Sequence, residues 1–186
     1  IFAADCIAMQ QPQTALELLN DALPLIKEGG NIGDEAFALH GLGDAYRLLG
    51  QLDKAIEYYQ RALDMRQKMN EKIQDAYSIS WISQTEILRG NLIEALSQSN
   101  RALTIVDQVR RQYSSPLLGA SYSSSTHHYY ARHIPLLLKL HAREPAAGYD
   151  KLAFQTSERA HARALLESLS SAGNNPQTGL PAELTE

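Results

Sequence analysis

The chain has 186 residues, a hydrophobic share of 44% and a formal net charge of −4. That hydrophobic share is ordinary for a folded protein, and no apolar run approaches the ~20 residues that cross a bilayer, so we expect no membrane partner. The mild acidity, without Gly-rich or aromatic and basic motifs, does not favour nucleic acid as a partner. One cysteine and no visible secretory segment indicate a cytoplasmic protein.

Apolar and small residues recur at three- and four-residue steps through most of the chain, which is the pattern of amphipathic helices. Glycine, proline and asparagine separate these stretches. We therefore expect helices at 1–10 (a remnant), 12–29, 34–50, 52–69, 73–89, 92–112, 116–143 and 149–170. Asp34 is the expected N-cap of the third helix. Pro24 and Pro135 are expected to kink or interrupt the helices that contain them.

The stretch 35–66 is the unit that the rest of the chain repeats. Five small or apolar positions recur at intervals of 40 residues: Ala15, Leu16, Leu19, Ala22 and Leu23; Ala55, Ile56, Tyr59, Ala62 and Leu63; and Ala95, Leu96, Ser99, Ala102 and Leu103. The small residues, together with Gly43, allow paired helix backbones to approach closely.

At this spacing the sequence resembles a tetratricopeptide (TPR) array, through Leu42, Gly43, Tyr46, Gly50, Ala55, Tyr59 and Ala62. The resemblance implies an all-α, right-handed TPR-type solenoid of about four helix pairs, with a period longer than the usual ~34 residues. We expect TPR repeats over 1–112, the first of them truncated. An irregular last pair with a long first helix would fill 113–170, and 171–186, rich in Gly, Pro and Asn, would form a flexible tail.

The C-terminal third carries a second resemblance, over about 109–172. Its most specific part is Ser157-Glu158-Arg159-Ala160 followed by Ala162-Arg163-Ala164-Leu165-Leu166. This region is similar to the segment that links TPR repeats to the caspase-like CHAT domain in bacterial, especially cyanobacterial, proteins. The resemblance implies the regulatory or sensor region of a larger cysteine peptidase, whose catalytic domain would lie beyond residue 186. None of that domain's catalytic residues is carried by this sequence.

The sequence does not predict a catalytic or metal site. His127, His128 and His133 lack the i, i+4 spacing that places two ligands on one helix face, and the glycines at 41 and 43 do not form a phosphate loop. We assemble no nucleophile, base and orienting group from the remaining residues. We therefore expect a protein that is not an enzyme and that needs no cofactor or metal.

Stacked helix pairs instead offer a concave surface lined by the first helix of each pair. If Leu39, Leu42 and Tyr46 face the partner helix, the residues turned towards the groove are Phe37, His40, Asp44 and Arg47, followed by Tyr77, Ser80, Trp81 and Gln84. Tyr77 and Trp81 are four residues apart and share a face, so they are the expected hot spot for a protein or peptide partner. The alternative is that Trp81 is packed between neighbouring helices.

The last predicted helix is apolar over more than one face between Ala160 and Leu169. Such a helix needs cover from more than one side. Because Ile1 begins inside a helical pattern, we interpret the chain as a piece of a longer protein. We expect either docking of a downstream domain or homodimerisation through this helix. The function expected from all these features is a non-catalytic scaffold for protein–protein interaction.

Overall fold

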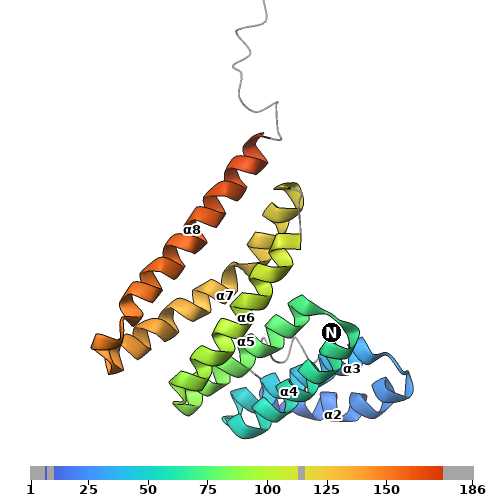
Figure 1. The fold of residues 1–186 in the computed structure, drawn as a ribbon. Coiled ribbons are helices and arrows are strands. Elements are labelled where there is room, and N and C mark those ends of the chain that lie inside the picture. The colour runs from blue at the N-terminus through green and yellow to red at the C-terminus, as the bar shows by residue number, and fades with distance from the viewer. Residues whose placement is uncertain (1–6, 8–10, 113–115, 174–186) are drawn as a thin grey trace, which may run out of the picture. The chain divides into compact units, whose positions relative to one another are not determined.

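The computed structural model describes Ile7, residues 11–112 and residues 116–173. Within these ranges the fold is all-α, as expected; α2 to α5 pack side by side in sequence with alternating direction, and α7 packs antiparallel to α8 (Figure 1). The elements are α2 (Pro12–Glu28), α3 (Ile32–Leu48), α4 (Leu52–Met69), α5 (Lys72–Arg89), α6 (Leu92–Gln112), α7 (Pro116–Arg143), the 3-10 turn η1 (Pro145–Ala147) and α8 (Tyr149–Gly173). The expected remnant helix at 1–10 and most of the expected tail at 171–186 lie outside the described residues.

The predicted ends of the helices are confirmed where glycine or asparagine closes a turn. Gly50 follows α3 with φ of 73°, in the left-handed region that residues with a Cβ rarely adopt. Asn70 closes α4 with φ of 58°, and its backbone N–H donates to the carbonyls of the last helical turn. Asparagine replaces glycine there because its short side chain tolerates this conformation.

Two expectations about local structure need correction. Asp34 is not the N-cap of α3: the cap is Asn31, whose side-chain Oδ1 accepts from the backbone N–H of Gly33 at 2.9 Å and of Asp34 at 3.3 Å. Asp34 instead lies in the first turn, where its charge complements the helix dipole. Helices α2 and α7 also continue past Pro24 and Pro135, so neither proline ends its helix; the expected bends at these prolines stay predictions. Both prolines are exposed, so water can reach the carbonyl that each leaves without a backbone partner.

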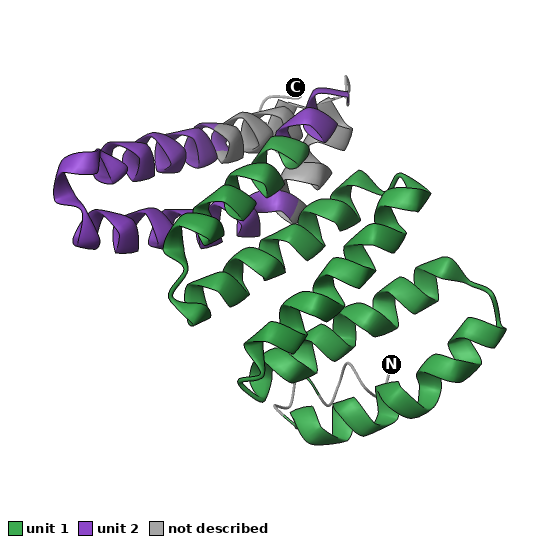
Figure 2. Ribbon diagram, turned by 60° about the horizontal axis from the view of Figure 1, so that its bottom comes forward, with its two compact units in different colours: residues 1–106 green, residues 107–186 purple. Residues whose placement is uncertain are grey.

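The chain divides into two compact units, residues 1–106 and 107–186 (Figure 2). In the first unit the core lies between paired helices and is built from the repeated small and apolar positions. Leu39 and Leu42 of α3 and Tyr59, Ala62 and Leu63 of α4 are buried almost completely. The repeat pattern therefore predicted these core residues correctly.

Gly43 lies at the closest approach of α3 and α4. A Cβ added there would stand 2.6 Å from the ring of Tyr59, a separation that real contacts essentially never show. We expect Gly43→Val to overpack this pair and to lower the free energy of unfolding by roughly 1–3 kcal/mol, measured by urea denaturation. Gly41→Ala is the control, because its Cβ meets a terminal methyl group of Leu19, which can move. A Gly43→Val variant as stable as the control contradicts this prediction.

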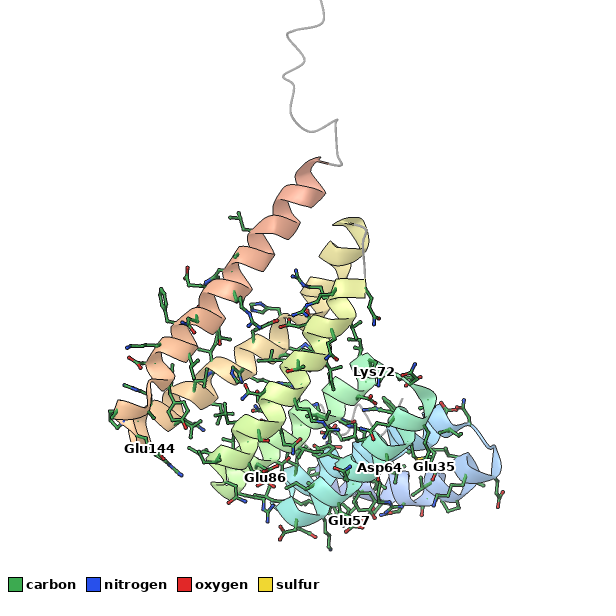
Figure 3. The ribbon with its side chains drawn as sticks, viewed as in Figure 1. Glu35, Glu57, Asp64, Lys72, Glu86 and Glu144 are labelled. Carbon is green, nitrogen blue, oxygen red and sulfur yellow. The ribbon has the colours of Figure 1, made fainter. Side chains whose placement is uncertain are left out.

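The third repeat keeps the fold although several apolar positions have become polar. Ser83 stands where Gly43 stands one repeat earlier, and its hydroxyl donates to the carbonyl of Ala95 at 2.7 Å. Glu86 (labelled in Figure 3) replaces Tyr46; its carboxylate accepts from Arg89 at 2.8 Å and from Asn91 at 2.7 Å. Both of these buried polar side chains therefore have partners, which removes most of the cost of burying them.

In the second unit, helices α7 and α8 pack against each other, and Asp107 at the end of α6 connects to both. The Tyr130 hydroxyl donates to Asp107 Oδ1 at 2.7 Å, and Arg159 Nη2 donates to Oδ2 at 2.9 Å. His133 lies on the same helix as Tyr130 and is only 4% exposed. No helix in the described part of the chain is both long enough and apolar enough to span a membrane.

Candidate protein-binding surface

Side chains of α3 and α5 meet although the two helices are separated by α4 in the sequence. The rings of His40 and Tyr77 have centroids 4.7 Å apart, and Tyr77 contacts Trp81 edge-on at 6.3 Å. The guanidinium of Arg47 lies over the Trp81 ring, 4.7 Å from its centroid. We call the accessible residues of this region the α3–α5 surface; they are Phe37, Arg47, Tyr77, Trp81 and Gln84.

The eight residues predicted to line a groove differ in exposure. Phe37 is 62% exposed, whereas Arg47, Tyr77, Trp81 and Gln84 are half-buried. His40 and Ser80 are buried, with 4% and 5% of their surface exposed, so a partner has little access to them. The side chain of Asp44 is 16% exposed. The predicted set therefore separates into accessible residues and a layer beneath them.

Tyr59 of α4 organises that lower layer. Its hydroxyl donates to Asp44 Oδ1 at 2.6 Å and accepts from Arg47 Nε at 3.3 Å. The ring itself is fully buried and lies 4.9 Å, centroid to centroid, from His40, which in turn has its Nε2 3.9 Å from Asp44 Oδ2. The buried hydroxyl of Tyr59 thus orients two charged side chains of α3, the carboxylate of Asp44 and the guanidinium of Arg47.

The electrostatics keep this tyrosine in its donor form. Burial raises the pKa of Tyr59 well above its ordinary value, and the neighbouring Asp44 carboxylate raises it further; Arg47 acts in the opposite direction. The hydroxyl is therefore protonated throughout the physiological range. Its hydrogen bond to Asp44 is charge-assisted, which makes it one of the stronger bonds in the region.

Arg66 is a buried cation beside Tyr77, and the sequence analysis did not identify this residue. Arg66 is 4% exposed, donates to the Ser78 hydroxyl and to the carbonyl of Gln74, and lies 5.8 Å from the Tyr77 ring centroid. A signal was present in the sequence: Arg66 follows Ala62 by four residues and so continues the buried face of its helix. A cation at such a position requires partners, and α5 supplies them.

Asp75 is a second buried ionisable side chain, near the start of α5. It is 2% exposed, and burial raises the pKa of its carboxyl. It forms an ion pair with Lys72 (labelled in Figure 3) at 4.0 Å. Across the described ranges, no group of three or more histidine, cysteine or acidic side chains is arranged to hold a metal ion.

Comparison with known proteins agrees with this architecture. Residues 2–68 match the family model described as "Tetratricopeptide repeat". This stretch is therefore similar to TPR repeats. A solved structure of BtubC (BKLC) from P. vanneervenii aligns over the whole chain and 67% of its own length, with a TM-score of 0.64 and 18% identity. The expected fold class, an all-α TPR-type solenoid, is thereby confirmed.

Two further relatives are informative. A solved structure of a putative kinesin light chain from Podosopora anserina, described as having nearly identical TPR-like repeats, aligns with a TM-score of 0.52 and 16% identity over 94% of each chain. Response regulator aspartate phosphatase A of Bacillus subtilis is 32% identical over 118 residues, or 63% of this chain. The chain spans only 30% of that relative's length.

Proposed function

We propose that this chain is a non-catalytic protein-interaction module that binds a peptide or protein on the α3–α5 surface, the concave side in the TPR arrangement. TPR domains in general bind proteins, which supports the class of function. The observation that carries the site is the accessible pair Tyr77 and Trp81, with Arg47 stacked on the indole. Aromatic and arginine side chains held in place by a buried layer are typical of interface hot spots.

The non-catalytic part of the proposal rests on the sequence, in which we find no nucleophile with a base and an orienting group. The same holds for a cytoplasmic setting and for the absence of nucleic-acid and membrane partners. The phosphatase relative is named for an action on response regulators, so its partner is itself a protein. That name is consistent with a protein-binding role for the repeats.

The test is a selection of random peptides displayed on phage, against the wild-type chain and the Tyr77→Ala, Trp81→Ala double variant. We expect the double variant to bind the selected peptides more weakly by about 2 kcal/mol or more, because both rings leave the contact surface. Affinities are measured by fluorescence polarisation, and circular dichroism shows whether the helices persist.

Phe154→Ala is the matched control, since it removes a ring that is 67% exposed on α8 and outside the α3–α5 surface. Full binding by a folded double variant would move the site elsewhere, first to the basic region around Arg159 and Arg163. If the double variant unfolds while the control does not, the two rings belong to the core. In either case the proposed surface is wrong.

A second candidate function is the regulatory region of a CHAT-type cysteine peptidase, with a downstream domain docked on α8. This alternative rests on the sequence resemblance of the C-terminal third. One structural observation favours a domain that covers α8. Phe154 and Leu165 are eleven residues apart, so they share a helix face, and they are 67% and 61% exposed. Leu166 and Leu169 have side chains outside the described set. A His and Cys pair in a strand-rich region encoded after Glu186 would support this function, and its absence there would exclude it.

A further inference from the structure

Arg47 differs from Arg89 and Arg159 in the partners it has. Arg89 pairs with Asp53 and Glu86, and Arg159 pairs with Asp107, each at 2.8–2.9 Å. Arg47 instead contacts a phenol oxygen and an indole face, both uncharged, and has no carboxylate partner among the described residues. Its positive charge is therefore not balanced by a direct ion pair.

The two contacts restrict the orientation of the Arg47 guanidinium. Nε is used by the Tyr59 hydroxyl, and the planar face lies on Trp81. The Nη1 and Nη2 groups carry the remaining donors, and the side chain is half-buried rather than fully enclosed. A guanidinium fork matches the two oxygens of a carboxylate, and a side chain that is already ordered loses less entropy when it binds.

The neighbouring acid does not compete for this fork. Asp44 receives the Tyr59 hydroxyl on Oδ1 and has the His40 ring at 3.9 Å from Oδ2. The Tyr59 hydroxyl is thus shared by Asp44 and Arg47, and no direct ion pair of 4 Å or less joins these two side chains among the described residues. A phosphate dianion usually requires a cluster of arginines, whereas Arg47 is the one cation of the α3–α5 surface; a single guanidinium suits a monoanion.

We propose that Arg47 binds an aspartate or glutamate side chain of the partner peptide, while an adjacent apolar residue of that peptide packs on Trp81. This inference rests on the proposed function and specifies the chemistry of its ligand. The bound group is a side-chain carboxylate and not the terminal carboxylate of the peptide. Peptides displayed with their C-termini fused to a phage coat protein present no free terminal carboxylate, so the selection distinguishes the two sources.

The experiment selects such peptides on three proteins: the wild-type chain, Arg47→Gln and Arg61→Gln. Arg61 is a matched control because its guanidinium also stacks on a ring, that of Tyr58 at 5.0 Å, but outside the α3–α5 surface. We expect Asp or Glu at one fixed position of the peptides selected by the wild type and by Arg61→Gln. Peptides selected by Arg47→Gln should show no acidic preference.

One selected peptide is then synthesised with an amidated C-terminus, with Glu or Gln at that position. The exchange of Glu for Gln should weaken binding to the wild type at least about tenfold and to Arg47→Gln by much less. This comparison on the wild-type protein holds even if the variant is poorly folded. Peptides that depend on Trp81 but have no acidic position overturn the inference and leave the proposed function standing. If no peptide binds, both are wrong.

Discussion

Replacing Tyr59 with alanine is expected to lower the free energy of unfolding by about 3–5 kcal/mol, the range for removing a buried aromatic ring. The ring is fully buried between α3 and α4 and lies against Gly43, so its loss leaves a void that a closely packed helix pair fills only partly. Asp44 and Arg47 lose their shared hydroxyl at the same time. Chemical denaturation followed by circular dichroism measures the change.

Two further variants separate the contributions. Tyr59→Phe keeps the ring and removes only the hydroxyl, so we expect a smaller loss of roughly 1–3 kcal/mol, because Asp44 and Arg47 lose the hydrogen bonds to that hydroxyl. Tyr58→Ala removes the adjacent ring, which is half-buried and stacks on Tyr46 at 5.2 Å. If Tyr59→Ala costs no more than Tyr58→Ala, the buried layer beneath the α3–α5 surface does not have the role given to it here.

Acidification is expected to destabilise the second unit through His133, by about 3 kcal/mol between pH 7 and pH 4. Burial lowers the pKa of His133 from 6.5 to about 4, and the positive charge of Arg159 contributes in the same direction. The unfolded chain therefore takes up a proton as the pH falls through 6.5, while the folded chain does so only near pH 4. The free energy of unfolding is unaffected above pH 7 and decreases across this window.

The measurement is the urea midpoint of the wild type and of His133→Leu at several pH values. Other groups titrate in both proteins, so the quantity of interest is the difference between the two curves. We expect the wild type to lose more stability than the variant on acidification. Parallel curves contradict the prediction and indicate that His133 is hydrated in the folded state.

The helices and their contacts were predictable because they depend on local periodicity and on a repeat. Ala55, Tyr59 and Ala62 define a helix face within one unit, and their recurrence at 40 residues defines the packing of the next. The prediction that Tyr77 and Trp81 share a face followed from the same spacing. The structure adds that Tyr77 contacts His40 and that Trp81 contacts Arg47, both in the preceding repeat. The repeat period alone predicts only that the two repeats are neighbours.

The polar layer could not be predicted in the same way. Whether His40 is exposed or buried depends on how closely Tyr77 of the next repeat approaches, and that distance is a property of tertiary packing. The N-cap of α3 was misplaced for a related reason. Asn31 and Asp34 are both good capping residues, and sequence propensity does not decide which of them begins the helix.

Arg47 and Arg66 connect consecutive repeats through side-chain contacts. Arg47 extends from α3 and Arg66 from α4, and both end on α5, at Trp81 and at Ser78. Repeat arrays transmit stability through contacts between neighbouring units. Because these contacts involve the same rings that face solvent, a ligand that immobilises Trp81 also strengthens the junction between repeats. Binding of a ligand to the α3–α5 surface should therefore slow the exchange of backbone amide hydrogens in α5. Hydrogen exchange then detects binding even when the ligand itself gives no signal.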